Sequence, residues 1–196
     1  LLGLARPRQA LLTLGAVAFS AAKADEPVRE YLDATTAASI TVPRDSLVFA
    51  RERSDLAANA RDYLTLTPLE INRSGKREYF WSGYLWSTLD RRGRAPILPA
   101  GAGLLLLADG RPIPLQNDHR PLRDHGVVEP PTPAPLRTAV PVLFAATPEV
   151  FAYVARADEL RVEVVEDGPG EFFALWKDAR PALRAFSERI SAAADR

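Results

Sequence analysis

The chain has 196 residues, 47% of them hydrophobic, and its 25 basic and 25 acidic residues give no net charge at pH 7. This composition supplies enough apolar residues to bury a core, which excludes disorder for most of the chain, and the length suits one domain. Cysteine is absent, which excludes thiol catalysis, thiolate metal sites and disulfide stabilisation.

The first 24 residues have the pattern of a secretory signal. Two arginines precede an apolar run over residues 10–19, and the small residues Ala22 and Ala24 form an Ala-x-Ala cleavage site. The apolar run is too short to cross a bilayer, which needs about 20 residues. The pattern predicts that residues 1–24 are removed on export. Residues 25–196 would then form one periplasmic domain that has no membrane span.

The charge of the predicted mature protein bears on its partners. Residues 1–24 carry three basic residues and no acidic ones, so 22 basic and 25 acidic residues remain, a net charge near −3. A mildly acidic domain has no electrostatic attraction for nucleic acid or anionic lipid. We therefore expect no nucleic-acid partner.

The first half of the predicted domain is a series of short extended segments. In chain order the patterns predict extended chain over residues 28–42, a strand over 47–50, a brief helix over 56–61 and a hairpin with arms at 63–71 and 79–89. Gly75 supplies the positive φ that a tight hairpin turn requires. Pro68 lies inside the first arm and lacks an N–H, which places it at a bulge or an edge.

The second half adds more hairpins and two helices. Strands are predicted over residues 103–108, 111–115, 140–146, 160–166 and 172–176, with a long loop after residue 115 that includes the proline-rich stretch 129–135. Helices are predicted to begin at Pro148 and after Asp178. The sum is a mainly antiparallel β or α+β domain, similar to a β-sandwich, with two helices in its C-terminal third.

The aromatic strand over residues 79–86 is the first candidate binding site. Two-residue periodicity places Trp81 on one face and Tyr84 and Trp86 on the other. These three side chains are candidates for stacking on a carbohydrate or another flat ligand. A central strand with core on both sides explains the same residues, because aromatic side chains dominate protein cores.

The only two histidines suggest a second candidate site. Asp118-His119 and Asp124-His125 each place an imidazole beside a carboxylate in the long loop, where the four side chains would bind a divalent metal if the loop folds back. The spacing is not that of a helical metal site and no further ligand is specified. A surface loop with polar turn residues explains the pattern equally.

Three stretches of the predicted domain are jointly familiar as sequence, namely residues 28–33, 47–63 and 83–91. They resemble a group of small exported proteins and lipoproteins of proteobacteria that have no known activity. The resemblance implies export. It implies no cofactor, catalytic residue or binding residue.

These patterns favour a non-enzymatic protein of the cell envelope. No nucleophile motif, catalytic carboxylate pair or phosphate-binding loop is present, so we expect no cofactor and no catalytic residue. The leading hypothesis is a domain that binds an envelope protein through a sheet edge or an exposed loop. A small-ligand binding module that uses the aromatic strand, and a metal-dependent hydrolase built on the two histidines, are the alternatives.

Overall fold

The structure is a computed structural model, and it describes residues 26–89, 96–98, 102–165 and 171–194. The predicted signal at residues 1–24 lies outside this part of the chain. No helix within the described ranges has the length and apolar character needed to span a membrane.

Ten strands, two α-helices and one 3-10 helix make up the described fold. The strands are β1 (Val28–Leu32), β2 (Ser39–Pro43), β3 (Leu47–Glu52), β4 (Arg61–Arg73), β5 (Lys76–Ser87), β6 (Gly103–Ala108), β7 (Arg111–Leu115), β8 (Val140–Ala145), β9 (Leu160–Val165) and β10 (Glu171–Lys177). The helices are η1 (Leu122–His125), α1 (Pro148–Val154) and α2 (Arg180–Ala194). This confirms the prediction of a mainly β, antiparallel fold with two α-helices.

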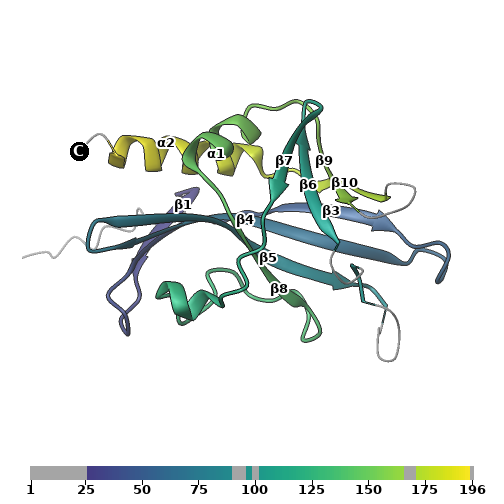
Figure 1. Cartoon of the computed structure of the whole chain (residues 1–196), viewed down its shortest axis with the longest axis horizontal. Helices are drawn as coiled ribbons and strands as arrows, with labels where there is room; N and C mark the ends of the chain where they lie inside the picture. Colours follow the sequence, from purple (N-terminus) through teal and green to yellow (C-terminus); the bar gives the residue numbers. More distant parts are fainter. Residues whose placement is uncertain (1–25, 90–95, 99–101, 166–170, 195–196) are drawn as a thin grey trace, which may run out of the picture.

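The long hairpin of β4 and β5 is the centre of the sheet (Figure 1). Its turn consists of Ser74 and Gly75, both at positive φ (53° and 89°), as a two-residue hairpin turn requires. One edge of β4 pairs with β5 throughout. Its other edge pairs first with β3 and then with β2. The sheet therefore forks at β4.

From this fork the sheet curls without closing. One branch continues from β3 through β10, β9 and β6 to β7, the other from β2 to β1, and β8 adds to β5. Beyond β7 the chain returns toward β8, where Asn117 forms an isolated bridge with Phe144. The Asp118 N–H donates to the Leu143 carbonyl at 2.7 Å.

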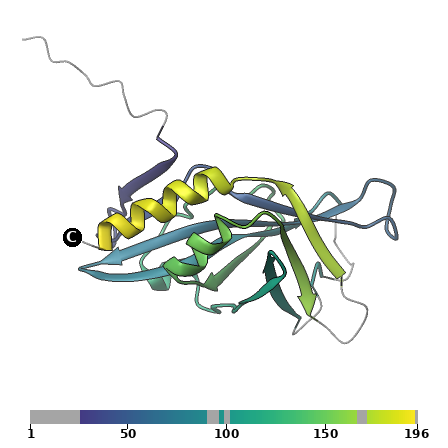
Figure 2. The same ribbon diagram turned by 90° about the horizontal axis from the view of Figure 1, so that it is seen from above.

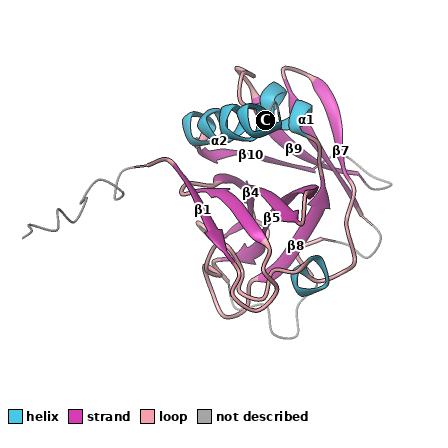
Figure 3. Cartoon of the chain, turned by 90° about the vertical axis from the view of Figure 1, so that its left-hand side faces the viewer, coloured by secondary structure: helices cyan, strands magenta, loops and turns pink. Residues whose placement is uncertain are grey.

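The helices and the long loop cover different parts of the sheet. Figure 3 shows α1 and α2 together on one side and the 3-10 helix on the other, and Figure 2 shows α2 from above. Phe151 of α1 contacts Trp81 edge-on at 4.8 Å and Phe186 of α2 at 5.4 Å, which joins both helices to the main core. A second apolar cluster, which includes Ile40, Leu69 and Val127, lies beneath the segment that contains the 3-10 helix.

One local prediction is wrong. Residues 56–61 were expected to be helical, but residues 54–59 form turns that connect β3 to β4, and β4 begins at Arg61. The Arg53 N–H donates to the Ala60 carbonyl at 2.9 Å, and Asn59 has a positive φ of 62°. Hairpin closure therefore overrides the helix propensity of this alanine-rich stretch.

Candidate functional site

The three aromatic residues predicted to bind a ligand do not share an open surface. Trp81 is 1% exposed and belongs to the core. Tyr84 is also buried, and its hydroxyl donates to the Thr132 carbonyl at 3.0 Å. The predicted alternation is nevertheless observed, since β5 pairs with β4 in regular register throughout. Of the three side chains, only Trp86 lies at the surface.

Trp86 belongs to an aromatic group contributed by three strands. Its ring stacks on Tyr63 of β4, with the ring centres 4.1 Å apart and the planes 11° from parallel. Trp176 of β10 meets Tyr63 edge-on at 6.1 Å. The Trp86 indole N–H donates to the Thr65 hydroxyl at 3.3 Å, which holds this ring against the sheet.

Beside this group is a depression that we call the β10 groove, with a volume of about 510 Å³. Its lining residues are Ala50, Arg51, Glu52, Arg61, Glu171, Phe172, Ala174, Leu175 and Trp176. Ala174 and Ala50 are partners across β10 and β3, so that two small side chains lie between the larger ones. Phe172 is 53% exposed and Trp176 is 58% exposed, which is unusual for large aromatic side chains.

The position of Trp176 has a local structural cause. The pairing of β10 with β3 shifts register between Leu175 and Lys177, which places Trp176 at an irregularity of the β-bulge type. Bulges redirect side chains and are common beside functional sites. The Arg61 guanidinium lies 4.8 Å from the centre of the Trp176 ring, within the range of a cation–π contact. The Trp176 ring is thus exposed to solvent while Arg61 packs against one of its faces.

The charged side chains of the β10 groove are paired with one another. Arg61 contacts Glu52 at 3.3 Å. Arg51, only 6% exposed, contacts the fully buried Asp62 at 3.2 Å, pairs with Glu171 and donates to the Ile97 carbonyl at 2.8 Å. Two cations and two anions line the groove, so it presents no net charge to a ligand.

The structure separates the two histidines predicted to bind a metal. His125 is buried, with Nε2 at 3.2 Å from an Asp118 oxygen and Nδ1 at 3.7 Å from a Glu78 oxygen. His119 is exposed, and its Nδ1 lies 3.5 Å from the Asn117 amide nitrogen.

The carboxylates of the predicted metal site are also divided. Asp124 is exposed and lies 3.7 Å from Arg123. Arg120 forms a two-point ion pair with Asp118, which holds the pKa of this carboxyl group well below its usual range. Within the described residues, no group of three or more His, Asp or Glu side chains is arranged to hold a metal. Of the four predicted metal ligands, the structure brings only Asp118 and His125 into contact. This arrangement does not support a metal-dependent hydrolase.

Asp33 anchors the segment that covers the second apolar cluster. One carboxylate oxygen accepts the Val128 N–H at 2.8 Å, and the other accepts the N–H groups of Thr35 and Thr36 at 2.9 and 3.2 Å. The Thr36 hydroxyl in turn donates to the Gly126 carbonyl at 2.6 Å. These donors, Val128 foremost, lower the pKa of Asp33. The turn between β1 and β2 is thereby tied to residues 126–128.

This anchor predicts a local response to acid. The pKa of Asp33 is lowered in the folded state. The stabilisation by its carboxylate is therefore complete above the unfolded-state pKa of about 3.9 and is lost as the pH falls through the folded-state pKa. We expect hydrogen-exchange protection of the Thr35 and Val128 amides, which both donate to Asp33, to fall relative to core amides between about pH 6 and pH 2. Asp33→Asn should lower that protection already at the higher pH, whereas D124N, at an exposed carboxylate of the same segment, should not. Equal protection of the anchored amides at both pH values would contradict the anchor.

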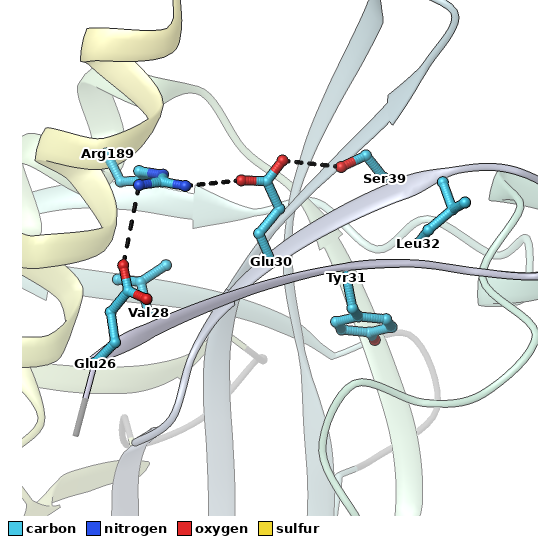
Figure 4. Close-up of a pocket in the computed structure, with 7 residues that line it drawn as sticks. All are labelled: Glu26, Val28, Glu30, Tyr31, Leu32, Ser39 and Arg189. Carbon is cyan, nitrogen blue, oxygen red and sulfur yellow. Dashed lines mark hydrogen bonds and ion pairs between the residues drawn. The ribbon is translucent and has the colours of Figure 1, made fainter. Parts of the chain in front are cut away.

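A second depression lies where β1 meets α2 (Figure 4), with a volume of about 390 Å³. Arg189 of α2 contacts Glu30 at 2.9 Å and Glu26 at 4.0 Å, and the Ser39 hydroxyl donates to Glu30 at 3.1 Å. Figure 4 shows Tyr31 on the opposite side of β1 from Arg189. Arg189 is shared between the two carboxylates, and these contacts hold α2 against β1.

Comparison of the chain with protein-family models, with curated proteins and with solved structures finds no match. The resemblance to exported proteobacterial proteins therefore stays a prediction. The pattern of residues 172–176 predicts a strand but does not identify Phe172 and Trp176 as surface residues. Both faces of that strand are apolar, so periodicity alone does not distinguish the covered face from the open one.

Proposed function

We propose that this chain is a non-enzymatic exported protein of the cell envelope that holds a segment of another protein in the β10 groove. The observation that carries the proposal is the exposure of Phe172 and Trp176 on either side of Ala174. Export to the periplasm enters the proposal from the sequence pattern of residues 1–24.

The composition of the groove supports a protein partner. Tryptophan, tyrosine and arginine are the residues most enriched among those that dominate binding energy at protein interfaces. Trp176, Tyr63 and Arg61 form such a group in direct contact. The paired charges at the margin resemble the polar rim that surrounds a binding centre.

The support of Trp176 by its neighbours adds to this argument. A side chain already held in one orientation loses less conformational entropy when it binds. Tyr63 meets the Trp176 ring edge-on and Arg61 lies over it, so the ring is braced before any partner arrives.

Binding of a small flat ligand is the second candidate function, and Trp86 is the residue that favours it. One face of its ring is occupied by Tyr63, and its indole N–H already donates to Thr65. Half-burial of the ring leaves a limited surface for stacking. Tyr63 contacts both Trp86 and Trp176, so the Trp176 variant also tests a ligand large enough to extend from Trp86 across Tyr63.

The proposal is tested by site-specific photocrosslinking in cells of the native host. A photoreactive amino acid at position 172 should give one crosslinked product, and the Trp176→Ala exchange in the same chain should remove it. The same photoreactive residue at Lys76, which is exposed at the tip of the β4–β5 hairpin, is the positional control. A product at position 172 that persists without Trp176, or no product at all, would overturn the proposal.

Once a partner is purified, the affinities of variants measure how much Trp176 contributes to binding. Trp176→Ala should weaken binding about 30-fold, which corresponds to roughly 2 kcal/mol, because it removes a braced aromatic side chain from the centre of the contact. Leu32→Ala is the matched control, since Leu32 is a large apolar side chain exposed on β1. Titration calorimetry of both variants, with thermal unfolding as the check on folding, measures the difference. Equal affinities for the two variants would show that the groove is not the binding surface.

A further inference from the structure

We infer that the segment bound in the β10 groove is proline-rich and extended. The inference rests on the proposed function and names the chemistry of the partner. It follows from four observations. The charged groups of the groove are paired, its walls are aromatic, the Trp176 indole N–H has no partner among the described residues, and this chain already packs a proline-rich segment on the same face of the sheet.

The polar groups of the groove favour a ligand that needs few hydrogen bonds from side chains. Arg61 is paired with Glu52, and Arg51 is held by Asp62, Glu171 and the Ile97 carbonyl. Between these charges lie Ala50 and Ala174, which offer only apolar contact. A carbohydrate would find partners for its hydroxyl groups only at the margin, on Glu52 and Glu171, and none at Ala50 and Ala174, and burying unpaired polar groups is unfavourable. The pyrrolidine rings of proline require no such partners.

The walls of the groove match the dimensions of a polyproline helix. Phe172 and Trp176 are four residues apart on β10, or roughly 13 Å at about 3.3 Å per residue. A polyproline II helix rises about 3.1 Å per residue and makes no internal hydrogen bonds, so four to five residues span both walls and their carbonyl groups remain available. Aromatic-lined grooves are the common binding surfaces for such segments.

The indole of Trp176 offers a donor to a peptide carbonyl. The Trp176 indole N–H makes no hydrogen bond with any described residue, and the side chain is exposed. The indole N–H of Trp86, by contrast, is occupied by Thr65. A bound proline-rich segment would present acceptors to Trp176 and no competing donors of its own, because proline lacks an N–H.

The same face of the sheet already holds a proline-rich segment of this chain. Tyr84 and Trp86 lie on one face of β5, as their two-residue spacing requires. The Tyr84 hydroxyl donates to the carbonyl of Thr132, in the middle of the predicted proline-rich stretch 129–135. Thr132 is half-buried there next to the buried Pro131, and Pro130 lines the neighbouring depression together with Tyr84. An aromatic donor that binds the carbonyl of a proline-rich segment is thus present on this face of the sheet, on β5, which β4 and β3 separate from β10. Trp176 offers a partner the same kind of contact.

The test is titration of the purified protein with a decaproline peptide, monitored by tryptophan fluorescence and by calorimetry. We expect saturable binding that Trp176→Phe weakens several-fold, since it keeps an aromatic ring and removes the N–H donor. Trp176→Ala should weaken it at least about tenfold. Leu32→Ala should bind as the unchanged protein does, and thermal unfolding of each variant checks that it is folded. A glycine-serine peptide of equal length is the control for nonspecific binding.

The outcomes separate this inference from the proposed function. Absence of decaproline binding, together with a Trp176-dependent crosslink at position 172, would overturn the proline-rich partner and leave the protein partner standing. Equal binding of the glycine-serine peptide, or decaproline binding that W176A does not change, would also overturn the inference. Binding of a β-linked tetrasaccharide that depends on Trp176, with no crosslink and no peptide binding, would overturn both and assign the groove to carbohydrate.

Discussion

Replacing Gly83 with alanine should destabilise the fold by about 3 kcal/mol or more, although alanine is only one methyl group larger. A Cβ atom at this position would lie 2.7 Å from the carbonyl carbon of Thr65 and closer still to the carbonyl oxygen. Both atoms belong to the backbone of β4, which is fixed between β3 and β5 and has no freedom to withdraw. Overpacking typically costs about 1–3 kcal/mol when side chains can move, and more is expected where only backbone can yield.

Gly103 provides the matched control, because it also lies in a strand of the same sheet. An added Cβ there would meet the Val165 Cβ at 3.6 Å, which is an ordinary contact distance. Gly103→Ala should therefore be close to neutral, or stabilising by up to about 1 kcal/mol through the unfolded state. Urea denaturation of the two variants measures the difference in unfolding free energy. Equal losses of stability would show that β4 and β5 do not approach as closely at Gly83 as the structure has it.

The local signals in the sequence predicted much of the sheet correctly. Gly75 was predicted to supply a positive φ, and it occupies that turn position between β4 and β5. Pro68 lies where β4 passes from its last pair with β3, at Leu66, to its first pair with β2, at Glu70. It was predicted at a bulge or edge, and it occupies a short interval in which one edge of β4 has no partner strand. These features follow from backbone chemistry within a few residues, so the sequence contains them directly.

The candidate site depended on contacts that local patterns do not contain. Trp81 and Trp176 both lie in apolar strands, yet α1 covers the first and no described element covers the second. Asp118-His119 and Asp124-His125 look equivalent along the chain, but Asp118 contacts His125, the last residue of the 3-10 helix. Which face of a strand is covered, and which carboxylate meets which imidazole, depends on residues far away in the sequence. Periodicity therefore identified candidate residues without identifying their partners.

Asp62 is the position at which the loss of one charge should be most costly. Its side chain is fully buried, and one oxygen receives Arg51 at 3.2 Å and Arg53 at 3.0 Å. Arg51 is itself buried, with its guanidinium 4.8 Å from the Phe173 ring centre. Asp62→Ala leaves that guanidinium inside the protein without its innermost counter-charge. Breaking a buried ion pair in this way typically costs about 3–5 kcal/mol.

Asp55 gives the control. It pairs with Arg53, which also contacts Asp62, but Asp55 is exposed whereas Asp62 is buried. Asp55 contacts Arg53 at 2.9 Å, but its side chain is 60% exposed, so water compensates for its loss. We expect Asp55→Ala to leave the urea midpoint almost unchanged, whereas Asp62→Ala moves it strongly. Asp62→Asn keeps the shape and removes the charge, and it should lie between them. If D62A and D55A shift the midpoint equally, Arg51 finds other compensation at this end of the sheet.

Because Arg51 also pairs with Glu171 at the margin of the β10 groove, a D62A protein that remains folded should bind the partner segment more weakly. The buried pair at Asp62 thus links the stability of β3 and β4 to the shape of the proposed binding surface.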